Sequence, residues 1–457
     1  MTGPVEKSLQ VLLPTIGSSG DVHPTIALAL ALRARGHRTT ILTYPIFEPL
    51  IKSLGIEFLA VGTIAQVEAL IGNPDLFHPR KGFALLTRHA IVPAIEPVYR
   101  LIEAHANSNT VIAASSLALG ARVAQEKLGI PLATVHLQPC IIRSLIDPGM
   151  VGNLRLSSTQ PLWFKRAFFS LADWAGIDPH LKGPLNKFRA TLGLTPISRV
   201  LYHWIHSSQC VISLFPDWFA APQADWPVHT HTVGFPLWDG GGHVPVPAEV
   251  LEFLDAGEPP IIFTPGSAGS TMQRFFRESV QAACNLKRRA MLITNFPQQL
   301  PRDLPLGVKA FGYVPFSEVL PRAALLVYHG GIGTLAQTIR AGIPHLVVPN
   351  GFDQFDNGAR IEHLRLGLSI PQSRYRARSA TDAIATLLAD AALKLRCQEY
   401  SSRIDSANTL TRACELIESL APAATLSSSA PTPSSPMQRP LATAPPKAPR
   451  YESQARY

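Results

Sequence analysis

Short apolar runs alternate with amphipathic stretches over most of the chain, as strands and helices do when they follow one another. In the first half, the apolar runs predict strands at residues 9–13, 39–43, 57–61, 111–114, 132–135 and 211–215. Nearly continuous apolar runs of this length indicate parallel strands that are covered on both faces. The stretches between them favour helices, so we expect the first half to form a doubly wound α/β domain.

The same alternation returns in the second half. There the apolar runs predict strands at residues 261–264, 291–294, 308–311, 324–328 and 345–348, with helices from residue 381 through 417. Three consecutive glycines at 240–242 and two prolines shortly after them indicate a linker. We therefore predict an α/β fold of two Rossmann-like domains, residues 1–238 and 257–420, joined by residues 239–256. Residues 421–457 are dominated by Ala, Pro, Ser and Thr and are predicted to be disordered.

Residues 142–207 interrupt this alternation with a helical, aromatic pattern. Four aromatic residues surround two basic ones there: Trp163, Phe164, Phe168 and Phe169 around Lys165 and Arg166. The favoured interpretation is a helix that faces the core. The alternative is an amphipathic helix that forms a lid over an apolar ligand or contacts a membrane.

The richest chemistry follows the strand predicted at residues 324–328. His329, Gly330, Gly331, Ile332, Gly333 and Thr334 stand at its end, before a helical pattern. Glycines at a strand-to-helix turn let backbone N–H groups approach an anion, and the helix N-terminus adds its positive dipole end. His329 and Thr334 can both donate to a diphosphate. Asp353, Gln354, Asp356 and Asn357 follow the next strand, where ligands of α/β sheets bind, and Asp356 and Asn357 have helix capping as an alternative role.

This stretch resembles the donor-binding signature of the nucleotide-sugar-dependent glycosyltransferases of the GT-B type, which have two Rossmann-like domains facing across a cleft. The resemblance implies that His329, Thr334 and the backbone of Gly331 and Gly333 contact the diphosphate of the donor. It also implies that Asp353 and Gln354 hold sugar hydroxyls.

Three further positions, Tyr313, Val314 and Gln337, follow from the same resemblance. Tyr313 and Val314 stand in the segment that contacts the base, with Tyr313 stacking on it. Gln337 stands where many members carry a ribose-binding Glu. Ser267, in a second strand-to-glycine turn, either faces the phosphates or caps the next helix.

The first domain supplies the expected base. Residues 17–24 read Gly-Ser-Ser-Gly-Asp-Val-His-Pro, and the resemblance assigns the general base to Asp21, with His23 as the local competitor. The alternative for Asp21 is helix capping, because Asp favours such positions. This turn lacks the G-x-G-x-x-G pattern, so we expect no dinucleotide cofactor. No D-x-D triplet is present, and we expect transfer without a metal.

Several first-domain segments narrow the resemblance to one branch of this family. They are residues 95–99, 116–122, 218–220, 225–227 and 234–239, and they are similar to the bacterial rhamnosyltransferases of rhamnolipid synthesis. The branch implies an inverting hexosyltransferase that moves L-rhamnose from dTDP-L-rhamnose onto a hydroxy-fatty-acid dimer. Three alternatives stay open: a UDP-glucose-dependent glucosyltransferase acting on a sterol, terpenoid or macrolide, a nucleotide-sugar 2-epimerase, and a binding subunit without turnover.

Charge and cysteine content add the expected partners and location. The formal net charge of +9 suits an anionic substrate or an anionic membrane surface, and no block of basic residues indicates nucleic acid. The five cysteines are widely spaced and suggest a reducing compartment. The N-terminus does not resemble a signal peptide, and no apolar run approaches the length of a membrane span. We expect a cytoplasmic enzyme, with peripheral contact at the inner membrane as a further expectation.

Overall fold

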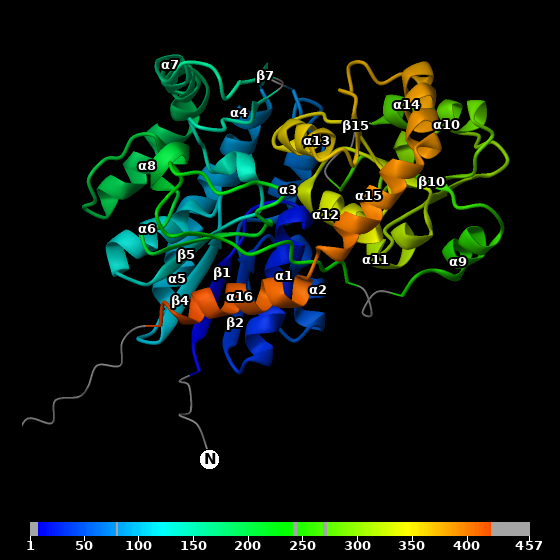
Figure 1. Cartoon of the computed structure of the whole chain (residues 1–457). Coiled ribbons are helices and arrows are strands. Elements are labelled where there is room, and N and C mark those ends of the chain that lie inside the picture. The colour runs from blue at the N-terminus through cyan, green and yellow to red at the C-terminus, as the bar shows by residue number, and fades with distance from the viewer. Residues whose placement is uncertain (1–7, 79–80, 153, 241–244, 268–271, 422–457) are drawn as a thin grey trace, which may run out of the picture. The chain divides into compact units, whose positions relative to one another are not determined.

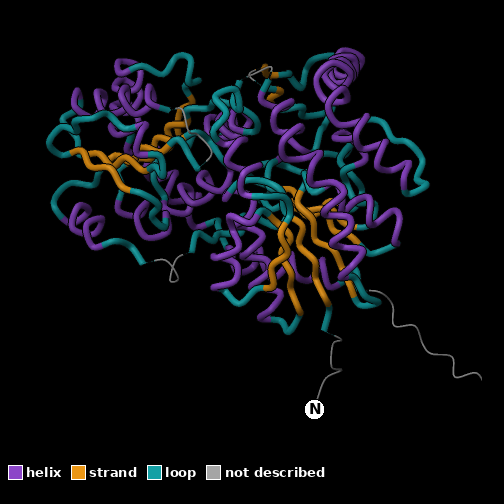
Figure 2. Tube along the Cα trace, turned by 180° about the vertical axis from the view of Figure 1, so that it is seen from behind, coloured by secondary structure: helices purple, strands orange, loops and turns teal. Residues whose placement is uncertain are grey.

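The computed structural model describes residues 8–78, 81–152, 154–240, 245–267 and 272–421. The described residues contain two parallel sheets, one in each half of the chain (Figures 1 and 2). This is the doubly wound α/β architecture that the hydrophobic pattern predicts. The predicted tail lies outside the described residues, apart from Ala421.

The first sheet has seven strands in the described residues, in the order β3-β2-β1-β4-β5-β8-β9. Their bounds are β1 Gln10–Pro14, β2 Arg38–Thr43, β3 Glu57–Ala60, β4 Thr110–Ser115, β5 Leu132–His136, β8 Cys210–Ser213 and β9 Thr230–Thr232. The pairings between neighbouring strands are parallel. β1 lies between β2 and β4, so the chain reverses its direction of winding beside β1, where ligands of α/β sheets bind.

Helices cover both faces of this sheet (Figure 2). The helices of the first half are α1 Ser19–Ala34, α2 Glu48–Ser53, α3 Ile64–Ile71, α4 Gly82–Leu86, α5 Val92–His105, α6 Leu119–Leu128, α7 Leu162–Ala172 and α8 Asp178–Thr191. A short antiparallel pair, β6 Met150–Val151 and β7 Leu154–Arg155, precedes α7.

The second sheet has six strands in the described residues, in the order β12-β11-β10-β13-β14-β15. Their bounds are β10 Ile261–Thr264, β11 Ala290–Ile293, β12 Val308–Phe311, β13 Leu325–Tyr328, β14 His345–Val347 and β15 Gly367–Ser369. The helices are α9 Ala248–Asp255, α10 Gln273–Asn285, α11 Phe316–Val319, α12 Ile332–Ala341, α13 Gln354–His363, α14 Ala377–Ala389 and α15 Ala391–Ser402. β10 here occupies the place that β1 has in the first sheet.

The last helix, α16 Ser406–Glu418, packs on the first half of the chain. Glu418 accepts hydrogen bonds from Arg35 Nε at 2.6 Å and from His37 Nε2 at 2.8 Å. Thr409 Oγ1 donates to the carbonyl of Val233 at 3.1 Å. Figure 1 shows this orange helix beside α1 and β2. The division into residues 1–238, 239–256 and 257–420 remains a proposal, and α9 lies within the stretch proposed as linker.

The favoured interpretation of the aromatic helix is wrong. α7 exposes Trp163, Phe164 and Leu171 and buries Lys165 and Phe169. Among the described residues, we find no helix with the length and apolar character needed to cross a membrane.

Candidate active site

The turn between β1 and α1 is built around the carboxyl group of Asp21. The backbone N–H of Ser18, the residue before the helix, donates to Asp21 Oδ2 at 2.8 Å. Gly17 has a φ of +156°, and a Cβ at that position would lie 2.1 Å from the same oxygen. The turn therefore needs glycine to admit the carboxylate. Burial raises the pKa of Asp21 to about 6. Asp21 thus both caps the helix and titrates in the range useful to a general base.

His23 lies in a different environment from Asp21. Its ring packs edge-on against Trp238, with centroids 5.1 Å apart, and against Tyr313 at 6.4 Å. Burial lowers the pKa of His23 to about 4, although the nearby charge of Asp239 opposes this shift. A histidine with this pKa is neutral near pH 7 and accepts a proton weakly. The higher pKa of Asp21 therefore favours Asp21 over His23 as the candidate base.

Tyr313 is tied to the stretch that connects the two halves. Its hydroxyl donates to the backbone carbonyl of Asp239, and the Asp239 carboxylate accepts from Ser317 N at 2.7 Å and Oγ at 3.0 Å. The ring of Tyr313 is partly exposed, whereas Val314 is buried. A partly exposed ring held at one end is suited to stack on a base, and this role for Tyr313 remains a proposal.

The imidazole of His329 lies in a space left by two glycines. A Cβ on Gly266, whose φ is +84°, would lie 2.5 Å from His329 Cε1, and a Cβ on Gly331 would lie 2.4 Å from Nε2. Nδ1 is buried and has no hydrogen-bond partner among the described residues. Burial lowers the pKa of His329 to about 4, so the ring is neutral and offers one N–H. A buried, unpartnered ring nitrogen at the start of a helix suits a polar ligand.

The N-termini of α1 and α12 approach each other closely. A Cβ on Gly333 would lie 4.0 Å from Cα of Gly20, and each of these glycines is the second residue of its helix. Thr334, the third residue of α12, follows directly. Two positive helix ends therefore converge from the two sheets, which favours an anion near them.

Asp353 is the residue before α13 and is held to the glycine turn by Asn357. Asn357 Nδ2 donates to Asp353 Oδ2 at 2.7 Å and to the carbonyl of Gly330 at 2.9 Å. Burial, and then the negative charge of Asp21, raise the pKa of Asp353 to about 7. The carboxyl groups of Asp21 and Asp353 therefore lie close enough to interact, although they come from different halves of the chain.

The other predicted positions are distributed around this centre. Gln354 is buried, and its Oε1 accepts from the backbone N–H of Asn350 at 2.9 Å and of Gly351 at 3.2 Å, so it shapes its own loop. Gln337 is buried on the second turn of α12. Ser267 is exposed after Gly266, and because residues 268–271 lie outside the described residues, both of its roles stay open.

Asp356 has a role that the sequence analysis missed. It lies inside α13 and does not cap the helix: its carboxylate accepts from Met150 N at 3.0 Å and from Arg360 Nε at 2.7 Å. Arg360 also donates to the carbonyl of Phe219 at 3.1 Å. The pair thereby ties the helix after Asp353 to loops of the first half. In the sequence, the four-residue spacing of Asp356 and Arg360 was the one feature that could have predicted their ion pair.

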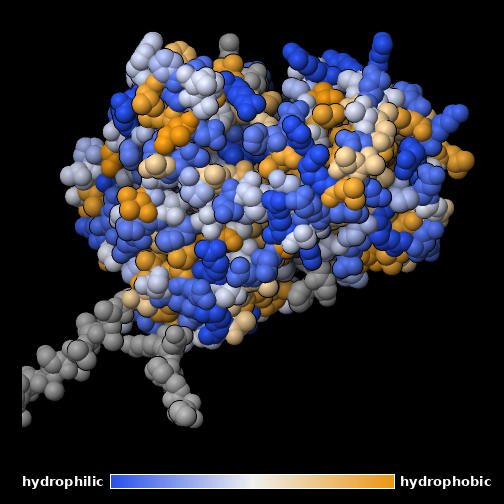
Figure 3. All heavy atoms as spheres, in the orientation of Figure 1, coloured by the Kyte–Doolittle hydropathy of each residue, from blue (hydrophilic) through white to orange (hydrophobic). Residues whose placement is uncertain are grey.

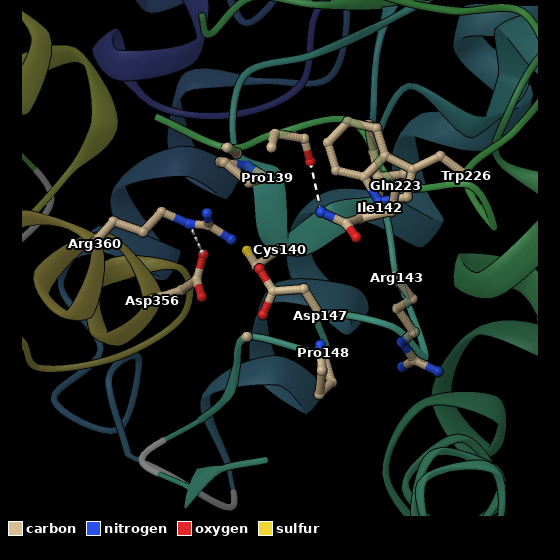
Figure 4. A pocket seen from close by; sticks show the side chains of 13 residues that line it. Pro139, Cys140, Ile142, Arg143, Asp147, Pro148, Gln223, Trp226, Asp356 and Arg360 are labelled. Carbon is tan, nitrogen blue, oxygen red and sulfur yellow. Dashed lines mark hydrogen bonds and ion pairs between the residues drawn. The ribbon is translucent and has the colours of Figure 1, made fainter. Parts of the chain in front are cut away.

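A pocket lies beside this pair (Figure 4). Its walls come from the loop after β5, from residues 220–226 and from α13, and they include Cys140, Trp226 and Asp356. Arg143 points away from the other labelled side chains in Figure 4. Asp356, which lines the pocket, follows Asp353 by three residues at the start of α13. The pocket therefore adjoins the predicted sugar-binding carboxylate.

Family models match both halves of the chain. The glycosyltransferase family 28 N-terminal domain matches residues 11–145, and the erythromycin biosynthesis protein CIII-like C-terminal domain matches residues 290–417. The chain is a glycosyltransferase of the GT-B fold. The matched residues include Asp21 in the first half and His329, Thr334 and Asp353 in the second.

Individual relatives agree with this assignment. The glycosyltransferase is 28% identical to O-mycaminosyltylonolide 6-deoxyallosyltransferase of Streptomyces fradiae over 90% of this chain and 97% of that protein. It is 26% identical to a sterol 3-beta-glucosyltransferase of Debaryomyces hansenii over 90% of this chain, but spans 27% of that longer protein. The structure of a spinosyn rhamnosyltransferase complexed with thymidine diphosphate superimposes with a TM-score of 0.62 at 19% identity, covering 89% of this chain and all of that one.

Proposed function

We propose that this glycosyltransferase moves L-rhamnose from dTDP-L-rhamnose onto the hydroxyl of a 3-(3-hydroxyalkanoyloxy)alkanoic acid, with inversion, in rhamnolipid biosynthesis. The observation that carries the chemistry is the convergence of Asp21, His329 and Asp353 at two facing helix N-termini. The rhamnolipid branch rests on the first-half segments that resemble it. A similar 6-deoxyallosyltransferase and a rhamnosyltransferase that binds thymidine diphosphate support a deoxysugar on a thymidine nucleotide.

The transfer is a single displacement in this proposal. Asp21 takes the proton of the acceptor hydroxyl, whose oxygen attacks the anomeric carbon of the sugar. The bond from that carbon to the diphosphate oxygen breaks on the opposite side, and dTDP leaves with the bonding electrons. One bond forms while the other breaks, so the configuration at the anomeric carbon is inverted.

The leaving diphosphate needs stabilisation as its negative charge develops. His329, Thr334 and the backbone N–H groups after Gly331 supply donors, and the N-terminus of α12 supplies a positive dipole end. Donors already fixed by the glycine turn need no reorganisation during the reaction. In this proposal these groups meet the charge without a metal ion.

Asp353 and Gln354 hold the sugar in the attack position. Because the pKa of Asp353 is about 7, the carboxyl group is partly protonated at neutral pH and can donate to a sugar hydroxyl as well as accept from one. Gln354 directs its oxygen to its own loop, which leaves its amide nitrogen as the group available to the sugar.

The donor assignment is supported by Gln337. Gln337 is 7% exposed, and a carboxylate in this buried position near a diphosphate would be electrostatically unfavourable. A ribose presents two hydroxyls that such a carboxylate could bind, whereas a thymidine nucleotide presents the 3′-hydroxyl alone. A neutral Gln therefore fits dTDP better than it fits UDP.

A UDP-glucose-dependent transfer onto a sterol, terpenoid or macrolide is the second candidate. Similarity to the sterol 3-beta-glucosyltransferase favours it. The proposal also includes a location: a cytoplasmic enzyme that meets its amphiphilic acceptor at the inner membrane.

Transfer assays with separated substrates test the proposal. The protein is incubated with dTDP-L-rhamnose or UDP-glucose, each with a hydroxy-fatty-acid dimer, a sterol or a macrolide aglycone, and products are identified by mass spectrometry. We expect rhamnosylated lipid from dTDP-L-rhamnose. Glucosylated sterol or macrolide from UDP-glucose, without rhamnosyl product, would promote the second candidate. Nucleotide binding without any transfer would point to a binding subunit.

A further inference from the structure

Helix α7 exposes several large apolar side chains to solvent and buries the charged Lys165. Trp163 is 71% exposed, Leu171 59%, and Trp174, in the π-helical turn after α7, 73%. Lys165 and Asp173, in contrast, are buried. A helix on the surface of a globular protein normally shows the opposite arrangement. The exposed face, formed by Trp163, Ala167, Leu171 and Trp174, is called the α7 face below.

Buried polar contacts fix this orientation. Lys165 Nζ donates to the carbonyl of Ser158 at 3.0 Å. Asp173 Oδ1 pairs with Arg143 Nη1 at 2.6 Å, and the Arg143 guanidinium lies 5.0 Å from the ring centre of Phe169. Turning the helix over would leave the half-buried Arg143 without its carboxylate, which is unfavourable. The exposure of the two tryptophans is therefore a consequence of the packing beneath them.

The exposed residues form one continuous stripe. Trp163, Ala167 and Leu171 are spaced by four residues and Trp174 follows after three more, which places them on one side of the helix. Leu162 and Phe164 extend the apolar surface at its start. Figure 3 shows hydrophobic atoms beside hydrophilic ones in the region where Figure 1 places α7. Contiguous apolar surface of this kind marks a site of interaction.

The charges on α7 and on the segments that flank it in the sequence favour one occupant. In the described part of residues 154–190, the exposed side chains that are charged at pH 7 are all basic: Arg155, Arg166, Lys182 and Lys187. The two carboxylates of this region, Asp173 and Asp178, are buried or half-buried. Tryptophan beside arginine and lysine is the composition of surfaces that lie in the headgroup layer of anionic bilayers.

We propose that the α7 face docks on an anionic lipid surface, with Trp163 and Trp174 entering the headgroup layer and the basic side chains meeting the lipid phosphates. A second copy of this chain fits less well, because two such faces would bring like charges together. Arg143, the partner of Asp173, also lines the pocket beside Asp356, so the ion pair beneath the α7 face reaches the wall of the pocket. Only the further step, that a lipid acceptor reaches the pocket from the bilayer, rests on the proposed function.

Vesicle sedimentation with the full chain tests the proposal. The probes are vesicles of phosphatidylcholine alone and of phosphatidylcholine with phosphatidylglycerol. We expect the protein to sediment with the anionic vesicles, less so as salt is added, and the tryptophan fluorescence to shift to shorter wavelength. The double variant Trp163→Ser with Trp174→Ser should bind at least about tenfold more weakly, because two large apolar side chains are lost from the contact. Leu306→Ser with Leu395→Ser is the matched control, since both leucines are exposed elsewhere, and should bind like the parent.

A second variant removes charge and leaves the apolar stripe intact. Arg166→Gln with Lys182→Gln should weaken binding by about thirtyfold, from roughly 1 kcal/mol per basic residue near an anionic surface. Thermal unfolding of each variant confirms that it is folded.

The proposal would be overturned if the parent protein did not bind the anionic vesicles. It would also be overturned if the leucine control lost as much vesicle binding as the tryptophan variant. Self-association that requires Trp163 and Trp174 would assign the face to a second copy. Binding of an acidic protein with no binding to lipid would assign it to a protein partner. No sugar donor is present in these measurements, so their failure is separate from failure of the transfer assay.

Discussion

Replacement of Asp21 by asparagine separates its two roles. The side-chain oxygen of Asn can still accept from the Ser18 N–H, and the side chain still fits beneath Gly17. An amide cannot take a proton from an acceptor hydroxyl. Asp21→Asn therefore preserves the helix cap and removes the base, whereas Asp21→Ala removes both.

Loss of a positioned base is expected to cost about 10²–10⁴-fold in kcat. Binding of dTDP should change little, because proton acceptance is needed in the transition state and not in the nucleotide complex. In the parent, the rate should fall as the pH drops below about 6, where Asp21 becomes protonated. The residual transfer rate of Asp21→Asn should not show this fall at acidic pH.

The same substitution should stabilise the fold at high pH. The pKa of Asp21 is about 6 in the folded protein against an ordinary 3.8, so the folded state holds the proton more tightly than the unfolded chain. The contribution of Asp21 to the free energy of unfolding therefore falls as the pH rises from about 4 to about 6, and it stays at the lower value above pH 6. A shift of roughly two pH units corresponds to about 3 kcal/mol, so Asp21→Asn should unfold at a higher temperature than the parent at pH 8 and at a similar temperature at pH 4.

The measurements are kcat and KM for transfer, calorimetric titration with dTDP, and thermal unfolding at both pH values. If Asp21→Asn transfers within a few-fold of the parent and Asp21→Ala merely loses stability, Asp21 is a cap and His23 becomes the candidate base. If the melting temperature at pH 8 does not rise, the carboxylate is not held in a buried, unfavourable environment.

Further substitutions test the neighbouring groups. Gly331→Ala and His329→Ala should each weaken dTDP binding at least about tenfold, because the Cβ of the first would lie 2.4 Å from His329 Nε2 and displace the ring that the second removes. Parent-like affinity in calorimetry would contradict the role of the ring, and excess EDTA should leave transfer unchanged. Asp353→Asn should stabilise the protein more at pH 8 than at pH 5, because the pKa of Asp353 is about 7 and its charged form is the one that destabilises the fold. If the substitution changes the melting temperature equally at both pH values, the raised pKa of Asp353 is contradicted. Gln337→Glu should shift the ratio of affinities from dTDP towards UDP, and an unchanged ratio would remove Gln337 from donor selection.

The strands of both sheets were predictable because their sequences are almost continuously apolar. β10 and β12 begin and end where the pattern places them. β9 and β15 were missed, since each has three residues with Thr, His, Gly or Ser among them and lies at a sheet edge. A strand this short with polar side chains gives no periodic signal, and its pairing comes from the neighbouring strand.

The orientation of α7 was not predictable for a related reason. Four aromatic residues around two basic ones predict burial of the rings, and the Arg143–Asp173 pair reverses this outcome. That pair joins residues thirty positions apart, and no local pattern reports it. The glycine turn that is expected to bind the donor could be predicted, because its glycines, His329 and Thr334 follow one another in the sequence. The hydrogen bond from Met150 N to Asp356 could not be predicted, because it joins the two halves of the chain.

The carboxyl groups of Asp21 and Asp353, at the centre of the site, have different chemical roles. Both are half-buried. Desolvation, and then the charge of Asp21, raise the pKa of Asp353 to about 7, whereas desolvation raises that of Asp21 to about 6. As the pH rises, Asp21 therefore loses its proton first, and in the neutral range it is the carboxylate available to accept the proton of an acceptor. A bound diphosphate would add negative charge near both groups and would favour the protonated form of Asp353, which then donates to a sugar hydroxyl.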